Sequence, residues 1–391
     1  MRRRRLWALG SLVVVLSAAA PSVAQPSAPL VQRSLGPVRL LTPSFGYAVA
    51  YRTTSVGSRT TATTHLFLYD SGRWRDATPP TLAMDGDNQI DDVAFVDRRH
   101  GWVAGFDCAT ARVHLYRTND GGESWMRLGR PAYHSCGSGP TYLIFVVTRQ
   151  GWMEPVSPNA PAGVLLQTRD GGKRWRQIAA GPPGQVPGPA LPCLAPIRFA
   201  TPVRGWMARC PSGGLYRTVD GGRVWTRIAI AMRNGADARF DVPWSRGGVA
   251  VVAATIGTTV PSRSGSVRAV VFALSHDAGR SWTVRSRRTL SSCPLAGYVA
   301  SPGPTSIAGF RTWWIVDDAQ APTVRTTTDA GRSWHATRAH GLPSRPCVIA
   351  SVTAVGAKRA WAVVRIGARE TRLFATRDGG RNWRPAGIPG A

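Results

Sequence analysis

Short apolar runs alternate along most of this chain with turns rich in glycine and aspartate. Residues 91–96 are mostly apolar, residues 97–101 form a polar turn, and further apolar runs follow at 102–105, 113–118 and 125–128. Runs this short, with no helical period of apolar positions, are typical of β-strands. Four strands in about 50 residues is the size of one propeller blade. The pattern therefore predicts an all-β chain.

An eight-residue signature, Ser/Thr-x-Asp-Gly/Ala-Gly-x-x-Trp, recurs six times at steps of 49–57 residues. Its aspartates are Asp120, Asp170, Asp220, Asp277, Asp329 and Asp378. Its tryptophans are Trp125, Trp175, Trp225, Trp282, Trp334 and Trp383. A decayed seventh copy contains Asp70, and a second motif, Gly-Trp or a variant of it, precedes every copy. Seven paired motifs predict seven stacked units, because one unit of a repeat cannot bury its own apolar face.

The predicted fold is a seven-bladed β-propeller in which each blade is a four-stranded antiparallel sheet. The signature aspartate is expected to accept backbone N–H groups of its own turn. The glycine two positions later is expected to adopt a positive φ, and the tryptophan to pin the outer strands. We therefore interpret the signature residues as structural.

The signature is identified as the Asp-box, or bacterial neuraminidase repeat. Together with the preceding Gly-Trp motif, it resembles the propeller family that includes the photosystem II stability and assembly factors, over roughly residues 36–391. The resemblance implies the fold but no single activity, because the same repeat occurs in sialidases, glucan hydrolases, sorting receptors and assembly factors.

The first 24 residues have the arrangement of a secretory signal peptide. A run of four arginines is followed by an apolar stretch at 6–20 and by a small-x-small site that ends at Ala24. We expect a signal peptide at 1–24, a linker at 25–35 and the propeller at 36–391, with no transmembrane helix after cleavage. The expected location is secreted or associated with the cell envelope, and the export route stays open.

Six cysteines are an even number, which suits disulfides in an exported protein. Fifteen pairings are possible, and the blade register favours Cys108–Cys136, Cys193–Cys210 and Cys293–Cys347. The spacing of cysteine and histidine does not suit zinc, so we expect no metal and no cofactor.

The chain carries a net charge of +28, almost all of it from arginine. A GC-rich genome would produce such a composition, but the arginines also recur in two classes of turn that share one face of a propeller. A ring of cationic turns attracts anionic partners. The binding candidates are Arg98, Arg149, Arg204, Arg223, Arg280, Arg311, Arg332 and Arg381. We expect a protein or an anionic envelope polymer as partner and no specific nucleic acid, because no recognition helix or RNA motif is present.

The predicted function is that of a monomeric, non-catalytic binding or assembly scaffold. The alternative is a glycoside hydrolase of the sialidase or glucanase type, which needs two carboxyl groups across the scissile bond. The chain has only three glutamates, and Asp107, Asp317 and Asp318 are the aspartates that could face the side opposite the arginine-bearing turns. No spacing marks two of them as a pair, so no catalytic residue is assigned.

Overall fold

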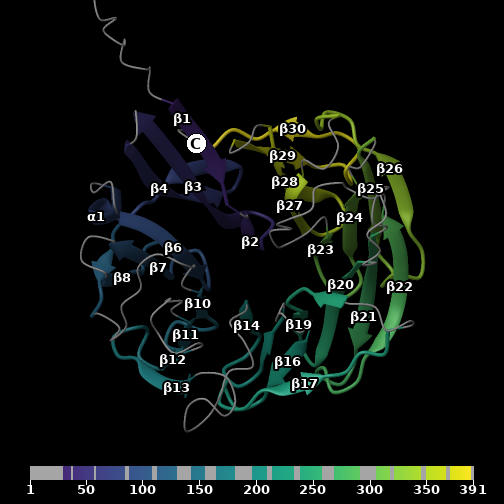
Figure 1. The fold of residues 1–391 in the computed structure, drawn as a ribbon, viewed down its shortest axis with the longest axis horizontal. Helices are drawn as coiled ribbons and strands as arrows, with labels where there is room; N and C mark the ends of the chain where they lie inside the picture. The colour runs from purple at the N-terminus through teal and green to yellow at the C-terminus, as the bar shows by residue number, and fades with distance from the viewer. Residues whose placement is uncertain are drawn as a thin grey trace, which may run out of the picture.

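The computed structural model describes residues 30–36, 38–56, 59–83, 88–107, 112–129, 142–154, 164–180, 196–208, 214–232, 238–257, 268–290, 305–317, 321–344, 349–366 and 370–388. These residues form seven antiparallel sheets arranged as blades around a central axis (Figure 1). The seven-bladed β-propeller predicted from the repeat is confirmed.

Each blade runs from an inner strand near the axis to an outer strand, which has two to five residues in every blade except blade 5. Blade 1 contains β1 (Leu30–Leu35), β2 (Arg39–Thr42), β3 (Phe45–Val56), β4 (Arg59–Asp70) and β5 (Arg73–Asp76), followed by the one-turn helix α1 (Pro80–Ala83). Blade 2 contains β6 (Asn88–Phe95), β7 (Gly101–Asp107), β8 (Arg112–Thr118) and β9 (Met126–Arg127). Blade 3 contains β10 (Tyr142–Phe145), β11 (Gly151–Glu154), β12 (Val164–Thr168) and β13 (Arg176–Ala180).

The remaining four blades repeat this order. Blade 4 contains β14 (Ile197–Phe199), β15 (Gly205–Met207), β16 (Leu215–Thr218) and β17 (Thr226–Ile228). Blade 5 contains β18 (Ala238–Phe240), β19 (Trp244–Arg246), β20 (Val249–Gly257), β21 (Arg268–Ser275) and β22 (Thr283–Leu290). Blade 6 contains β23 (Thr305–Ile307), β24 (Trp313–Asp317), β25 (Thr323–Thr327) and β26 (His335–Arg338), and blade 7 contains β27 (Ile349–Val355), β28 (Arg359–Arg365), β29 (Thr371–Thr376) and β30 (Arg384–Pro385).

Two blades have an inner strand divided into two pieces. In blade 1 both β1 and β2 pair with β3, and in blade 5 both β18 and β19 pair with β20. Each of these sheets is therefore a four-stranded blade with an interrupted inner strand. The prediction of a linker at 25–35 was wrong for its second part, because Leu30–Leu35 pairs in register with residues 50–55 of β3.

The hydrophobic core lies between neighbouring blades. The cluster between blades 2 and 3 joins Trp102 and Leu115 of one blade to Leu143, Phe145 and Met153 of the next, all of them buried. Burying one sheet face against the next sheet is the largest favourable contribution to such a fold. The blades therefore depend on one another for their cores.

The Gly-Trp motif builds these junctions. The indole of Trp152 in blade 3 stacks on Phe199 of blade 4 at 3.6 Å between ring centroids, and its Nε1–H donates to the carbonyl of Gly221 at 2.8 Å. Trp102 repeats both contacts one blade earlier. The glycine before the tryptophan is required by close packing, because a Cβ at Gly151 would lie 2.6 Å from the Phe145 ring.

Blades 1 and 5 depart from this arrangement. In blade 1 the hydroxyl of Tyr47 donates to the Val93 carbonyl of blade 2 at 2.7 Å, so a tyrosine makes the junction. In blade 5 the strand register places Val251 where blades 2, 3, 4, 6 and 7 have tryptophan, and Phe272 of β21 stacks on Trp313 of blade 6 instead.

The ring closes without a shared strand, since blade 1 and blade 7 each take their described strands from one end of the chain (Figure 1). Tyr69 and Trp361 meet edge to face at 5.6 Å between ring centroids. The Thr353 hydroxyl donates to the Val38 carbonyl at 2.7 Å. Side-chain packing and a few hydrogen bonds therefore join the two ends of the ring.

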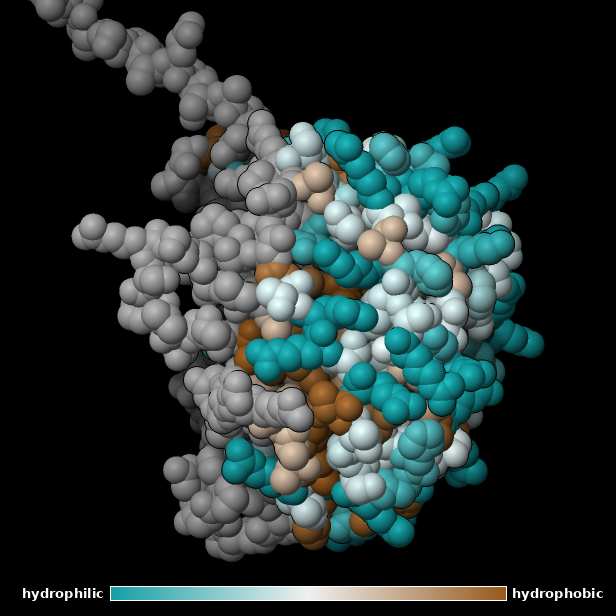
Figure 2. All heavy atoms as spheres, turned by 90° about the vertical axis from the view of Figure 1, so that its right-hand side faces the viewer, coloured by the Kyte–Doolittle hydropathy of each residue, from teal (hydrophilic) through white to brown (hydrophobic). Residues whose placement is uncertain are grey.

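The outer wall of the blades on the right of Figure 1 is largely hydrophilic (Figure 2). It includes β22 and β26, most of whose side chains are exposed. Within the residues described, no helix is long and apolar enough to cross a membrane.

Candidate binding surface

The six Asp-box turns have one hydrogen-bonding pattern. In blade 2 the Thr118 hydroxyl donates to Asp120 Oδ1 at 2.6 Å and accepts the N–H of Gly122 at 2.7 Å. The N–H groups of Glu123 and Ser124 donate to Asp120 Oδ1 at 3.1 and 3.0 Å. The aspartate thus accepts the backbone groups of its own turn, as the sequence predicts.

These hydrogen bonds favour the charged form of the aspartates. The hydroxyl and N–H of Ser124 hold the pKa of Asp120 well below its usual range, and serine hydroxyls do the same for Asp277 and Asp329. At Asp378 burial acts in the opposite direction, but hydrogen bonds from Asn382 outweigh it and lower the pKa to about 2.

The decayed copy at Asp70 forms a different turn. Asp70 pairs with Arg73 across a two-residue hairpin whose central residues, Ser71 and Gly72, have φ of 50° and 104°. The Asp70 carboxylate lies 3.1 Å from the Arg98 guanidinium of blade 2. The two-residue loop is too short for an Asp-box turn. Asp70 instead forms an ion pair that joins blade 1 to blade 2.

The box tryptophans lie at the same blade junctions. Trp383 is buried and the other five are half-buried. Trp125 donates its Nε1–H to the Ala77 carbonyl and Trp334 to the Ser286 hydroxyl, each in the preceding blade. The donors of Trp175, Trp225, Trp282 and Trp383 go to glycine carbonyls of their own box turns.

In each blade the box turn is hydrogen-bonded to the turn between the first and second strands. The residue after the box aspartate donates its N–H to a carbonyl of that turn, for example from Gly171 to Arg149 at 2.8 Å and from Ala330 to Arg311 at 3.0 Å. Since all blades have the same strand order, these paired turns lie on one side of the ring. We call this side the turn face.

The eight arginines named as binding candidates belong to the paired turns. Arg149, Arg223, Arg280, Arg311, Arg332 and Arg381 are exposed, and Arg204 is half-buried. Arg98 is half-exposed and engaged by Asp70 and by the Ser44 hydroxyl. The turn face therefore presents guanidinium groups around the ring, each attached to a turn that the Asp-box holds in place.

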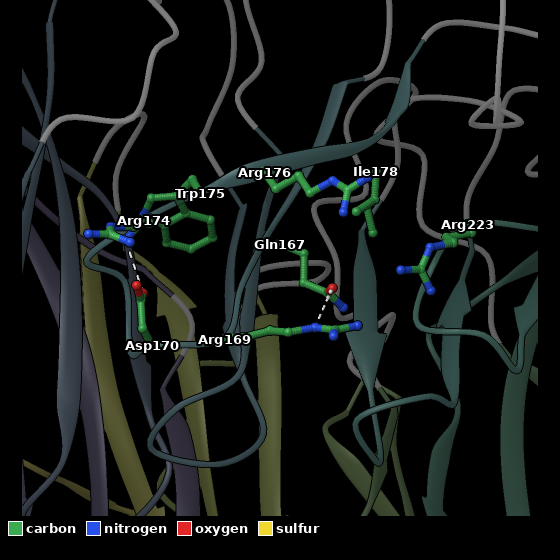
Figure 3. A pocket seen from close by; sticks show the side chains of 8 residues that line it. All are labelled: Gln167, Arg169, Asp170, Arg174, Trp175, Arg176, Ile178 and Arg223. Atoms are coloured by element: carbon green, nitrogen blue, oxygen red, sulfur yellow. Dashed lines mark hydrogen bonds between the residues drawn. The ribbon is translucent and has the colours of Figure 1, made fainter.

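A cleft of about 280 Å³ lies between the outer part of blade 3 and the box turn of blade 4. Its lining residues are Gln167, Arg169, Asp170, Arg174, Trp175, Arg176, Ile178 and Arg223 (Figure 3). Arg223 points toward the cleft from blade 4, and the Arg169 Nε donates to Gln167 Oε1 at 3.3 Å (Figure 3).

One side-chain replacement accounts for the place of the cleft. At the position of Gln167, blades 2 and 4 have Arg117 and Arg217, each paired with the second-strand tryptophan of its blade. Arg117 lies over the Trp102 ring at 5.5 Å and packs against the next box turn near Gly171. The shorter Gln167 fills less of the junction between blades 3 and 4.

The carboxyl groups considered for a hydrolase are spread over different parts of the fold. Asp107 ends β7, while Asp317 is buried at the end of β24, 3.3 Å from the Arg325 guanidinium. Glu123 and Glu370 are exposed, and Glu154 is fully buried at the end of β11. Asp318 lies outside the described residues, as do all six cysteines and hence the three predicted disulfides.

Two aspartates, one in an inner strand and one between the two pieces of the divided inner strand of blade 5, serve the blade junctions. Asp92 of β6 accepts the Leu143 N–H of blade 3 at 2.9 Å and lies 3.6 Å from the Arg39 guanidinium of blade 1. Asp241 accepts the Thr305 hydroxyl of blade 6 at 3.3 Å. Their oxygens therefore act in holding the ring together.

The family model of the photosynthesis system II assembly factor YCF48 matches residues 73–227, from β5 to β17. None of the curated proteins matches the chain. Similar solved structures include YCF48 bound to a D1 peptide, with 20% identity, coverage of 76% of this chain and 80% of that one, and a TM-score of 0.44.

YCF48 from Cyanidioschyzon merolae is 19% identical over 76% of this chain and 85% of that one, with a TM-score of 0.45. The α-L-arabinofuranosidase Arb93A from Fusarium graminearum, in complex with an iminosugar inhibitor, is 12% identical over 76% of this chain and 94% of that one, with a TM-score of 0.42. The repeat, the seven blades and the matching family model together identify the chain as an Asp-box β-propeller that resembles the photosystem II assembly factor YCF48.

Proposed function

We propose that this propeller is a non-catalytic binding scaffold that holds an acidic protein on its turn face. The observation that carries the proposal is the placing of exposed arginines on turns fixed by Asp-box hydrogen bonds. A rigid support reduces the ordering that a partner must cause on binding. The matching family model, that of an assembly factor, supports the same kind of role.

The positive charge of the turn face indicates an acidic partner. The whole chain carries 49 basic and 21 acidic side chains. On the turn face the box aspartates are engaged by their own turns, as at Asp120 and Asp378. Arg280 and Arg332 of the same turns are exposed, and their planar guanidinium donors suit carboxylates. A partner surface rich in aspartate and glutamate fits this face.

We also propose that the chain works outside the cytoplasm, in the cell envelope or beyond it. The support is the signal-peptide arrangement of residues 1–24, which lies outside the described residues. An extracytoplasmic partner is therefore the one to seek.

A charge-matched pair of variants tests the scaffold. Arg223, Arg280 and Arg332 are changed to glutamate on the turn face, and Arg285, Arg287 and Arg338 are changed to glutamate on the outer wall, where they are exposed. The wild-type chain and each of the two variants are used separately to capture proteins from an envelope extract at physiological salt. A protein retained by the wild type and by the outer-wall variant, but not by the turn-face variant, supports the proposal.

Other outcomes contradict it. Equal loss in both variants would mean that total charge alone attracts the partner, since both lose the same number of positive charges. Retention of an anionic polymer without protein would name a different class of partner. Release of sugar products from the extract would require a hydrolase instead.

A further inference from the structure

Exposed valines gather on the turn face at blades 3 and 4. Val203, Val219 and Val224 of blade 4 are 53%, 57% and 62% exposed, and Val147 of blade 3 is 45% exposed. We call these four residues the valine patch. Single exposed apolar residues are common, but a group of them on one surface marks an interaction site.

Hydrogen bonds place the turns that carry these four residues next to one another. Val219 and Val224 belong to one box turn, and Gly221 of that turn donates its N–H to the Val203 carbonyl at 2.9 Å. Gln150, whose N–H donates to the Val147 carbonyl, also donates its side-chain amide to the Pro202 carbonyl at 2.9 Å. The patch therefore spans two neighbouring blades.

Val224 replaces a residue that stabilises four of the other five boxes. At the same position Ser281 and Ser333 donate their hydroxyls to the box aspartate at 2.6 Å, and Asn382 donates its amide at 2.8 Å. Ser124 makes the same contact with Asp120. A valine cannot donate, so Asp220 lacks this side-chain hydrogen bond and an apolar group is exposed in its place.

Val203 is a second departure of the same kind. The carbonyl that accepts the box N–H belongs to Arg99, Arg149, Arg311 and Lys358 in blades 2, 3, 6 and 7. Blade 4 has valine there. In blade 4, two positions that are polar in most other blades are therefore occupied by exposed valines. Neither valine adds a contact that stabilises the fold, which points to a function.

We infer that the valine patch is the anchor for the partner on the turn face, and that it binds a segment of a protein with apolar side chains flanked by aspartate or glutamate. Charge complementarity selects this occupant, because Arg149, Arg204 and Arg223 lie in the same turns as the valines. An apolar centre within a charged rim is the usual arrangement of a protein interface. The inference rests on the proposed function and assigns it to blades 3 and 4.

The test uses a phage-displayed library of random 12-residue peptides, selected on the folded wild-type chain. The comparison variant carries Val203→Arg, Val219→Asn and Val224→Ser, the residues found at these positions in other blades, and circular dichroism verifies its fold. Val284→Ser is the matched control, since Val284 is an exposed valine on the outer wall.

The expected consensus combines apolar residues with aspartate or glutamate. Fluorescence polarisation of a consensus peptide should give at least about tenfold weaker binding to the triple variant and unchanged binding to the Val284→Ser control. Peptides selected for acidic residues alone, bound equally by the triple variant, would overturn the valine anchor and leave the scaffold proposal standing.

Four further results would overturn the inference. A neutral apolar consensus would contradict the acidic partner while keeping an apolar site. Selection of no peptide would exclude a linear segment as occupant. If the wild type sediments as a dimer and the triple variant as a monomer, the patch is a contact between two copies of this chain. If the wild type pellets with phospholipid vesicles and the triple variant does not, the patch is a membrane contact.

Discussion

Replacing Trp152 with alanine should lower the free energy of unfolding by about 3–5 kcal/mol, the usual cost of removing a buried tryptophan. The indole is fully buried and forms the junction between blades 3 and 4. Its loss removes the stack on Phe199 and leaves the Gly221 carbonyl without its 2.8 Å donor. Trp152→Phe keeps an aromatic ring but no donor, so about 1–3 kcal/mol should be lost for the unpaired carbonyl.

Urea unfolding followed by far-ultraviolet circular dichroism measures both changes. A double-mutant cycle with Phe199→Leu isolates the stack, and the coupling should be about 0.5–1.5 kcal/mol. Val284→Ala, on the outer wall, should change stability by no more than about 0.5 kcal/mol. A cost below about 1 kcal/mol for Trp152→Ala would refute the view that the second-strand tryptophans hold the blades together.

Three further predictions follow from the turns and the leader. The box aspartates have pKa values below the ordinary one of about 3.9, so the stability that they add is present above that pH and is lost as the pH falls toward the folded-state pKa values. The melting temperature should be level from pH 5 to 7 and should fall between pH 5 and 2. A level profile down to pH 2 would contradict this. The substitution Ala278→Gly should leave the free energy of unfolding unchanged or raise it by up to about 0.5 kcal/mol, because Ala278 has a φ of 60°. At the next residue, Gly279→Ala should lower it by about 2–4 kcal/mol, because the new Cβ would overlap the Trp206 ring. Similar melting temperatures for the two variants would contradict this packing. Mass spectrometry of the exported chain should find Gln25 as its first residue, and an intact Met1 in the envelope fraction would disprove cleavage.

The number of blades could be predicted because each unit repeats its turn chemistry locally. Aspartate, glycine and tryptophan act within eight residues of one another, so their spacing is visible in the chain. The junctions could not be predicted in the same way. Trp152 contacts Gly221, 69 residues away, and that contact exists only once two blades are stacked. Val251 takes the place of a tryptophan for a similar reason, since Phe272 supplies the stacking ring from another strand.

For the candidate surface, the sequence predicts the positive charge of the turns but not the apolar residues beside it. The arginines recur at fixed places beside the signature, so their pattern is visible in the sequence. The valines were missed because a single valine in a polar turn has no pattern of its own. A signal was nevertheless present: Val224 stands where four of the other five boxes have serine or asparagine. Comparing the boxes position by position would have found it.

The contacts between neighbouring blades have a consequence for synthesis. Trp125 and Trp334 donate to the blade made just before, and Trp102 and Trp152 donate to the blade made just after. A chain that emerges from the ribosome amino end first can therefore dock each new blade on the one made just before it. The joint between blades 1 and 7, where Tyr69 packs against Trp361 and Thr353 donates to Val38, needs both ends of the chain. A mutation there should delay the last step of assembly and leave the earlier blades able to form.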